Sequence, residues 1–482
     1  MKIPLVLAQV CCACAIVAGA TGAASSSDPP LRDRAAQALR LACEYFDRYV
    51  STEGGYLWTY SDDLQHRAGE QVAPATTVWV QPPGTPSVGL AFLRAYLATK
   101  DHYYLNLAKK AADCLRRGQL ESGGWSYRID FDPKDRSRWA YRVDGNVPSN
   151  KASNLSTLDD NTTQSALRFL ILLDQTLGLK DAAVHEVVEY GLRKLLEAQY
   201  PNGAWPQRFT GPPDPSRYPI KKASYPQSWP KTFPAKNYYD CYTFNDYAIC
   251  DMLSVMFLAA KVYQQSKYLT AAEKCADFIL LAQMPDPQPA WAQQYDANMH
   301  PTWARKFEPP AITGGESQAI LRTLLDVYQQ TGNRKYLEPV PRALAYLKKS
   351  VLPDGQLARF YELQTNRPLY FTKDYQLTYD DSDLPTHYRF KVPNSLGRIE
   401  ARYQQLLKAD ATQLARLRSV DEWKPSRPNP AEVQRVIAAL DEQGRWLEHA
   451  PHSRKPAHPH GKIISTATFI RNVGILADFL AR

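Results

Sequence analysis

The feature that most constrains this chain is a repeat of about 70 to 80 residues, a period in the range of helical arrays. Each unit consists of an amphipathic helix, a short polar turn, a second helix, and a long loop that contains glycine and an aromatic residue. The first helices begin near Ser87, Asn161, Phe244 and Glu316, and the second helices begin near His102, Asp181, Thr270 and Lys335. The sequence therefore predicts an all-α fold of at least four stacked helical hairpins.

A further predicted helix at 31–50, followed by GGYLWTY, is typical of the end of one more unit. Helical hairpins of this kind either grow as an open solenoid or close into a ring. In a ring the first helices run parallel on the inside, so their N-termini share one rim. The loops 117–160 and 200–243 are too long to be simple connections, and loops of that length commonly carry function. We therefore expect the functional face at that rim.

The N-terminus has the composition of a secretory signal. Lys2 precedes an apolar run over 3–20, and small residues follow over 21–27. We predict a signal peptide over 1–24 and a mature chain that is secreted or periplasmic, with retention as a membrane anchor as the alternative. No later stretch is apolar for long enough to span a bilayer.

Net charge and cysteine content say little about what the protein binds. The formal net charge of +9 suits a polyanion without identifying it. Removal of the signal takes three of the eight cysteines, and the remaining odd number shows no CxxC spacing, so neither a disulfide framework nor a zinc site is predicted. We expect a monomer that binds no nucleic acid and, after signal cleavage, no membrane.

Acidic residues recur where the first helices begin. They are Asp159 and Asp160 in STLDDNTTQ, Asp246 in YTFNDYA and Glu316 in TGGES. Acidic residues commonly cap helices, and TFND and TGGE both have the spacing of a capping box. Carboxylates that meet on one rim would instead repel each other unless a cation lay among them. Hard oxygen ligands without paired histidines or thiolates favour calcium or magnesium over zinc, and both interpretations stay open at this point.

Three arginines lie in loops beside aromatic residues: Arg305 in PTWARKFEPP, Arg359 in LARFYE and Arg367 in TNRP. A guanidinium can bind a sugar carboxylate through two parallel hydrogen bonds, although an ion pair that staples a loop is the alternative for each. Trp205 is a candidate for stacking on a sugar ring, but a tryptophan in such a repeat also commonly fills the core. Three arginines in rim loops favour an acidic sugar as the ligand.

Five sequence blocks together resemble the pectate lyases of polysaccharide lyase family 10. The blocks lie within 150–385 and are TLDDNTTQSALRFL, AQYPNGAWPQRF, YTFNDYA, WAQQYD followed by PTWARKFEPP and GGES, and LARFYELQTNRPLY. The resemblance implies an incomplete (α/α) toroid that forms one catalytic domain over 30–482. The part at 394–482 is then a helical extension outside the resemblance.

The resemblance also implies an activity, which is calcium-assisted β-elimination on the acidic polysaccharide polygalacturonate. It implies that Asp159 and Asp246 hold the calcium ion and the substrate carboxylate. Asp160 and Asn245 would lie beside them and contact the substrate. The extra segment at 210–236 departs from the family pattern and could reshape one wall of the cleft.

In the same resemblance, Arg305 corresponds to the proposed catalytic base and Arg367 to a substrate-binding arginine. Arg359 as a further carboxylate contact is our own inference. Because a guanidinium normally keeps its proton in proteins, we expect calcium and Arg367 to lower the pKa of Arg305, and an alkaline optimum to follow.

Two other functions remain open from the sequence. The first is an inverting glycoside hydrolase on the same toroid, with Asp160 as base and Asp246 as acid. The second is a secreted carbohydrate-binding protein that kept the cleft and lost turnover. A product with a new double bond, which absorbs ultraviolet light, would be made by a lyase and by neither alternative.

Overall fold

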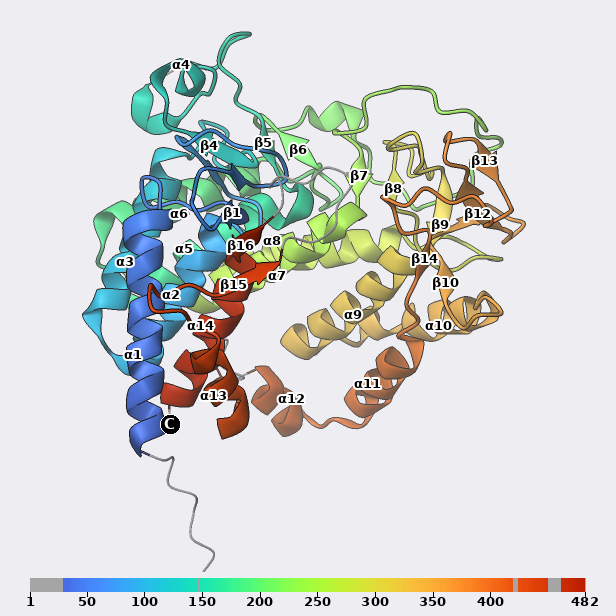
Figure 1. Ribbon diagram of the computed structural model, residues 1–482. Helices are drawn as coiled ribbons and strands as arrows, with labels where there is room; N and C mark the ends of the chain where they lie inside the picture. Colours follow the sequence, from blue (N-terminus) through green and yellow to red (C-terminus); the bar gives the residue numbers. More distant parts are fainter. Residues whose placement is uncertain (1–28, 146, 419–423, 450–460, 482) are drawn as a thin grey trace, which may run out of the picture.

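The computed structural model describes residues 29–145, 147–418, 424–449 and 461–481, and its ordered core is built from helical hairpins (Figure 1). The first helices are α2 (Thr85–Thr99), α5 (Thr162–Thr176), α7 (Ala248–Tyr263) and α9 (Gly314–Thr331). The second helices are α3 (His102–Arg117), α6 (Ala182–Glu197), α8 (Ser266–Leu281) and α10 (Val340–Lys349). The four predicted hairpins are confirmed. The predicted signal peptide lies outside the described residues.

Short strand pairs fix the rim of the ring. The strand before each first helix pairs antiparallel with a strand in the loop after the second helix. The pairs are β3 (Thr77–Trp79) with β4 (Arg128–Asp130), β5 (Ser156–Thr157) with β6 (Arg208–Phe209), β7 (Tyr242–Thr243) with β8 (Gln294–Tyr295), and β9 (Ala311–Thr313) with β11 (Phe360–Glu362). In Figure 1 the strands labelled β4 to β9 lie along one edge of the helices, so the N-termini of α5, α7 and α9 share that edge.

The two ends of the chain form one more unit together. Helix α1 (Pro29–Tyr45) continues as η1 (Phe46–Val50) and packs against α14 (Thr466–Leu480). The strand before α14, β16 (Lys462–Ser465), pairs with β1 (Thr59–Ser61), which repeats the pattern of the other units. The predicted fragment at 31–50 is therefore the second helix of a unit whose first helix lies at the other end of the sequence.

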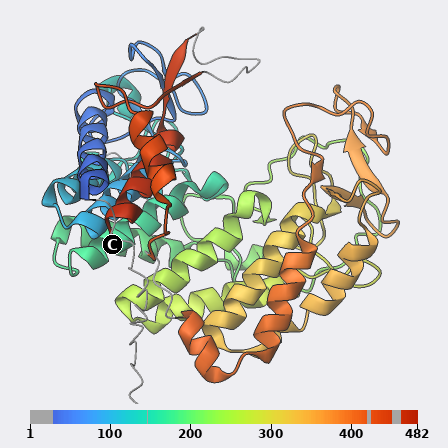
Figure 2. The same ribbon diagram turned by 60° about the horizontal axis from the view of Figure 1, so that its bottom comes forward.

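The ring does not close. Figure 2 shows an arc of helices, with the blue and red chain ends on one side and the orange helices on the other. Helix α11 (Leu396–Lys408) packs on α9 and α10, and α12 (Ala411–Arg418) packs on α9, whereas α13 (Pro430–Ala438) packs on α1 and α14. The fold is an incomplete (α/α) toroid, as expected. The backbone turns extended at Ala409, which separates α11 from α12.

The remaining elements are short and lie in the connecting loops. They are β2 (Arg67–Ala68), α4 (Pro133–Arg136), η2 (Arg142–Asp144), η3 (Asp159–Asn161), η4 (Pro215–Arg217), η5 (Asn245–Tyr247), η6 (Arg334–Leu337), β10 (Leu357–Ala358), β12 (Pro368–Phe371), β13 (Leu377–Thr378), β14 (Lys391–Val392) and β15 (Leu447–His449). In the described part of the chain no helix is both long and apolar enough to cross a membrane.

The loop tryptophans belong to the core. Trp125, Trp205 and Trp291 are all fully buried. Each indole Nε1 donates a hydrogen bond to a carbonyl in the last turns of the preceding second helix, at 2.8, 2.8 and 2.9 Å respectively. The prediction that Trp205 contacts substrate is therefore wrong, because its ring is 0% exposed and its polar atom is already paired.

Candidate active site

Two matching turns bring the predicted acidic residues together. The short helices η3 and η5 contact each other and lead directly into α5 and α7. In both turns two successive residues have positive φ, at 49° and 58° for Asp160 and Asn161, and at 47° and 61° for Asp246 and Tyr247. Non-glycine residues rarely adopt this backbone conformation, and it is concentrated at functional sites.

The capping interpretation of these acids is wrong. No side-chain cap bond forms at the starts of η5, α7 or α9, and Asn161, which precedes α5, makes none either. The Thr243 hydroxyl oxygen instead accepts from the backbone N–H of Asn245 at 3.2 Å. The Glu316 carboxylate accepts from Arg359 at 3.1 Å. None of these acids is therefore used as a helix cap, and Glu316 is paired with Arg359 instead.

Asp159, Asp160 and Asp246 form one carboxylate cluster, with an oxygen atom from each within 4.8 Å of the others. Each residue accepts one hydrogen bond from a neutral side chain. The donors are the hydroxyl of Tyr127 to Asp159 at 2.6 Å, the amide of Gln81 to Asp160 at 2.9 Å, and the amide of Asn245 to Asp246 at 2.7 Å. Among the described residues none of the three forms an ion pair with a lysine or arginine.

The cluster is electrostatically unfavourable without a cation. Burial, and then the charge of Asp159, raises the pKa of Asp160 to about 6. Burial, followed by the charges of Asp159 and Asp160, raises the pKa of Asp246 to about 7. One oxygen of Asp159 is buried without a partner in the described part of the protein. Clustered hard oxygen donors of this kind fit a calcium ion.

Arg305 lies within electrostatic range of this cluster, since its charge opposes burial and the neighbouring acids in their effect on the pKa of Asp160 and Asp246. Its guanidinium is held by Glu308 through two bonds, from Nε at 2.8 Å and from Nη2 at 2.6 Å. Glu308 is 1% exposed and also accepts from the hydroxyl of Tyr388 at 2.9 Å. Arg305 is thus fixed in place at the edge of the acidic cluster.

The protonation of Arg305 differs from the expectation. Burial disfavours its charge, but the hydrogen bonds and the charge of Glu308 outweigh burial and raise the pKa of the guanidinium. The expected lowering by Arg367 does not occur. Arg367 stacks on the ring of Tyr379 at 3.5 Å, and none of its described contacts joins it to Arg305 or to the aspartates. The sequence missed Glu308, although its place three residues after Arg305 was a signal for an ion pair.

Arg359 approaches the cluster from the side of α9. Its Nη1 donates to Glu316 at 3.1 Å, its Nε donates to the carbonyl of Arg389 at 2.8 Å, and its guanidinium lies 4.7 Å from the ring of Tyr388. Arg359 and Asp246 line the same pocket, so the two groups lie near each other. The structure therefore brings Arg305 and Arg359, but not Arg367, to the three aspartates.

Asn245 has a supporting position. It is 2% exposed, its amide nitrogen donates to Asp246, and its amide oxygen accepts from Gln293 at 2.8 Å. With both ends of the amide in use, Asn245 orients Asp246 and does not reach a substrate, which corrects the predicted substrate contact.

Two further residues at the cluster were not predicted. Tyr127 binds Asp159, and Arg208 donates to the Tyr127 hydroxyl at 3.3 Å while lying 4.1 Å from the ring of Tyr239. Both follow the buried loop tryptophan of their unit by two or three positions, and Arg208 pairs with Thr157 in the strand that leads to Asp159. That repeated spacing was the available signal.

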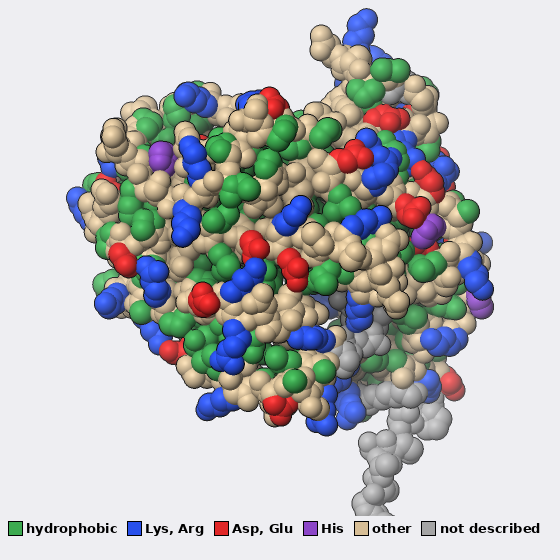
Figure 3. Space-filling model, turned by 180° about the vertical axis from the view of Figure 1, so that it is seen from behind, with side chains coloured by type: hydrophobic (Ala, Val, Ile, Leu, Met, Phe, Trp, Pro, Cys, Tyr) green, Lys and Arg blue, Asp and Glu red, His purple; other side chains and the backbone are tan. Residues whose placement is uncertain are grey.

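The inserted segment 210–236 packs against the loops that follow α8 and α10. The carbonyl of Pro230 accepts from the indole of Trp303 at 2.8 Å, and Lys231 pairs with Glu362 at 2.6 Å. On the face seen in Figure 3, lysine and arginine side chains are scattered among acidic and apolar ones, so the net positive charge is not gathered into a single patch there.

The fold and the site define a class. The protein is an (α/α) toroid whose rim combines a carboxylate cluster with fixed arginines, an arrangement suited to holding a cation and an acidic ligand together. Residues 119–356 match the family model described as pectic acid lyase. This region is therefore a pectic acid lyase domain, as its sequence blocks indicated, and it supports a pectate lyase enzyme.

Solved structures with a similar arrangement include a family 10 polysaccharide lyase from Cellvibrio cellulosa, at 22% identity and a TM-score of 0.45 over 67% of this chain and 96% of that one. A mutant of a family 10 lyase from the same organism, in complex with trigalacturonic acid, has 21% identity and the same TM-score over 67% and 97%. A D-mannose isomerase follows at 15% identity and a TM-score of 0.42 over 79% and 100%. No curated protein matches the sequence.

Proposed function

We propose that the protein cleaves polygalacturonate by β-elimination with the help of a calcium ion. The observation that carries the proposal is the meeting of Asp159, Asp160 and Asp246 opposite Arg305 within the pectic acid lyase region. The description of the matching family, which names pectic acid, supports the choice of substrate. We further propose that the protein acts as a monomer outside the cytoplasm, in keeping with the N-terminal sequence.

The chemistry explains why these residue types are needed. β-Elimination removes the proton at C5 of a galacturonate unit, next to its carboxylate, and expels the oxygen at C4. Negative charge grows on that carboxylate in the transition state and must be neutralised. Arg359 lies close to Asp246 and offers a fixed guanidinium for this purpose.

The acidic cluster fits a calcium ion. Asp159 and Asp246 would hold it, with Asp160 beside them, since all three offer oxygen ligands and Asp159 has a buried oxygen without a partner in the described part. When bound, calcium neutralises the substrate carboxylate and so makes the C5 proton more acidic. Asn245 keeps Asp246 oriented through its 2.7 Å hydrogen bond.

Arg305 is proposed as the base that takes the C5 proton. In the substrate-free protein Glu308 keeps the guanidinium charged, so a proton must leave Arg305 before it can accept another. We therefore expect activity to require alkaline pH, where this loss is less costly. Glu308 fixes the position of Arg305 through three hydrogen bonds, two from the side chain and one from its backbone N–H at 3.0 Å.

The geometry favours a lyase over the inverting hydrolase. An inverting enzyme needs its two carboxyl groups about 6.5–9.5 Å apart to leave room for a water molecule. Asp160 and Asp246 have oxygen atoms within 4.8 Å of each other, which is too close for that water. A binding protein without turnover shares the same cleft, and only an assay separates it from a lyase.

The test is an assay of purified protein on polygalacturonate, with calcium or with a chelator, that follows ultraviolet absorption of the unsaturated product. We expect product with calcium and little with chelator, restored when calcium is returned. New reducing ends without the absorbing product would identify a hydrolase, and binding without any product at any pH would identify a carbohydrate-binding protein.

A further inference from the structure

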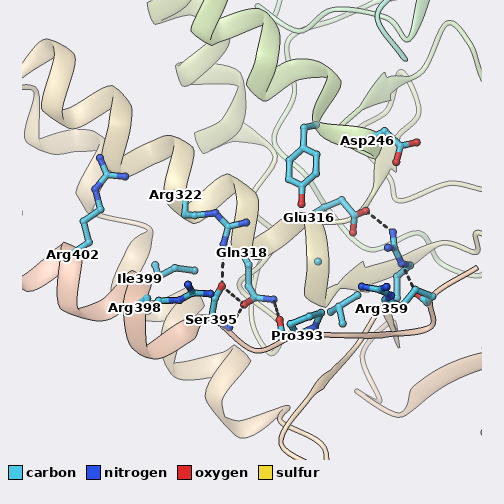
Figure 4. Close-up of a pocket in the computed structure, with 14 residues that line it drawn as sticks. Asp246, Glu316, Gln318, Arg322, Arg359, Pro393, Ser395, Arg398, Ile399 and Arg402 are labelled. Atoms are coloured by element: carbon cyan, nitrogen blue, oxygen red, sulfur yellow. Dashed lines mark hydrogen bonds and ion pairs between the residues drawn. The ribbon is translucent and has the colours of Figure 1, made fainter. Parts of the chain in front are cut away.

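A pocket continues from the acidic cluster along the side of the ring. It has a volume of about 600 Å³ and begins at Asp246 and Glu316. One wall is α9, with Gln318 and Arg322, and the other is the start of α11, with Arg398. Figure 4 shows Arg322 reaching down from α9 toward Ser395, with Arg398 at the same point from below. The pocket is therefore open to anything bound at Asp246.

The pocket contains guanidinium groups that no acid neutralises. Arg359 pairs with Glu316 and Arg402 pairs with Asp326, at 3.1 and 2.7 Å. In contrast, Arg322, Arg389 and Arg398 line the same pocket and form no ion pair with any carboxylate that the structure describes. Like charges that face one cavity repel each other, and an anion would remove that repulsion.

The buried side-chain amide of Gln318 holds Arg322 in position through Ser395. Gln318 is 3% exposed, and its oxygen accepts from both the backbone N–H and the hydroxyl of Ser395 at 2.7 Å. Its nitrogen donates to the carbonyl of Pro393 at 3.1 Å. The Ser395 hydroxyl thus gives its proton to Gln318 and uses its oxygen to accept from Nη1 of Arg322 at 3.0 Å. The guanidinium of Arg322 is fixed with its other N–H groups available.

We propose that this pocket binds a second carboxylate of the polyuronate chain, from a sugar unit further along than the one at the acidic cluster. The inference rests on the proposed function. Arg322 and Arg398 offer planar, forked donors of the kind that bind carboxylates. The pocket adjoins Asp246, so a chain bound there enters it without leaving the protein surface. The wall at 389–402 lies outside the region that matches the family model.

The proposal is tested first by binding in the presence of a chelator, so that no turnover is needed. Saturated galacturonate dimers and hexamers are titrated calorimetrically into the full chain and into its Arg398→Gln and Arg322→Gln/Arg398→Gln variants. We expect the double variant to lose at least about tenfold in affinity for the hexamer and to be unchanged for the dimer. Arg48→Gln, which removes an exposed charge on η1, is the matched control and should bind as the unsubstituted protein does.

The second measurement is KM against chain length with calcium present. A rise in KM confined to long substrates, with kcat kept, supports the second carboxylate site. Equal hexamer affinities, or equal KM values, for the double variant and Arg48→Gln would overturn it. The two proposals can fail separately. If the double variant binds the hexamer more weakly but the unsubstituted protein makes no unsaturated product, the second carboxylate site is supported and the lyase proposal is rejected. If product forms normally and the KM of the double variant is unchanged, the lyase proposal is supported and the second carboxylate site is rejected.

The single variant Arg398→Gln guards against a folding artefact. Arg398 is exposed and its guanidinium makes no described contact, so its loss leaves the fold intact. We expect it to show the same dependence on chain length as the double variant, with a smaller weakening of hexamer binding.

Discussion

Helix α5 has a carboxylate setting at each end, and the two differ. At its start, Asp159 and Asp160 meet Asp246 with no cation partner among the described residues, and each is bound by one neutral donor. Near its end, Asp174 is 0% exposed and its Oδ2 accepts from Nδ1 of His185 at 2.8 Å and from the hydroxyl of Tyr263 at 2.7 Å, while its Oδ1 is buried without a partner in the described part. We propose that the same residue type serves ligand binding at the rim and stability at the opposite end.

This contrast teaches how to separate functional from structural acids in a repeat fold. A structural carboxylate has beside it a side chain that can carry positive charge, as Asp174 has His185, and removing it costs stability. A functional carboxylate lacks such a partner and lies near others of like charge, so its removal costs activity and relieves repulsion. The predictions that follow test each side of the comparison.

The largest expected effect is on turnover at Arg305. Arg305→Lys keeps the positive charge but loses the forked geometry, and we expect kcat to fall by about a hundred- to ten-thousand-fold, the usual range for a lost general base. KM should change little. Steady-state kinetics on polygalacturonate provide the measurement, with Arg435→Lys on the exposed face of α13 as the control. Near-normal turnover would remove Arg305 from the role of base.

Asp246→Asn should separate activity from stability. We expect kcat/KM to fall by at least about a hundredfold, because the proposed calcium site would lose a ligand beside the developing charge. In the presence of chelator the variant should melt at a higher temperature than the unsubstituted protein, because a repelling charge has gone. Asp33→Asn on the exposed face of α1 is the control. A lower melting temperature would show that Asp246 is a structural acid and would break the comparison.

Asp174→Asn should have the opposite effect. The change replaces the charged acceptor of the hydrogen bond from His185 by a neutral amide oxygen in a buried setting, and we expect the free energy of unfolding to fall by about 1–3 kcal/mol. Denaturant titration gives this value. The protein that remains folded should keep its kcat/KM on polygalacturonate. A loss of activity without a loss of stability would place Asp174 in the functional group instead.

The smallest effect concerns pH. The hydrogen bond to Asp174, against the opposing effect of burial, raises the pKa of His185 in the folded protein, with smaller contributions from the charges of Asp174 and Glu189. The stabilisation is therefore complete below the unfolded-state pKa and is lost as pH rises through the higher folded-state value. We expect the stability difference between the protein and His185→Gln to shrink from about pH 5.5 to about pH 8.5, a range that spans the ordinary pKa of histidine. A difference that stays constant over this range would contradict this account.

Much of the fold follows from the sequence because its signals are local. Apolar periodicity and polar turns located the four hairpins, and the repeated order of helix, turn, helix and loop predicted the shared rim. The pairing of α1 with α14 could not be predicted in the same way, since it joins residues from opposite ends of the chain. The ion pair between Arg94 on α2 and Asp478 on α14, at 2.7 Å, depends on that same long-range contact.

The site was predicted less completely than the fold, because it depends on local backbone conformation and on ion pairs that the sequence does not reveal. Asp160 and Asp246 adopt positive φ, a conformation that aspartate tolerates but that residue preferences alone do not assign to a particular position. The raised pKa of Arg305 comes from Glu308, whose contact depends on how the loop folds. Sequence spacing also could not show that Arg367 stacks on Tyr379 and that none of its described contacts is with the three aspartates.

The most direct test of the central claim is a crystal structure of the Arg305→Lys variant with calcium and a galacturonate trimer, which should bind without being cleaved quickly. The account predicts one calcium ion bound by Asp159 and Asp246, with a substrate carboxylate on the same ion and the substituted side chain at position 305 facing C5 of that sugar. Calcium found elsewhere, or a trimer bound with its carboxylates turned away from the three aspartates, would contradict it.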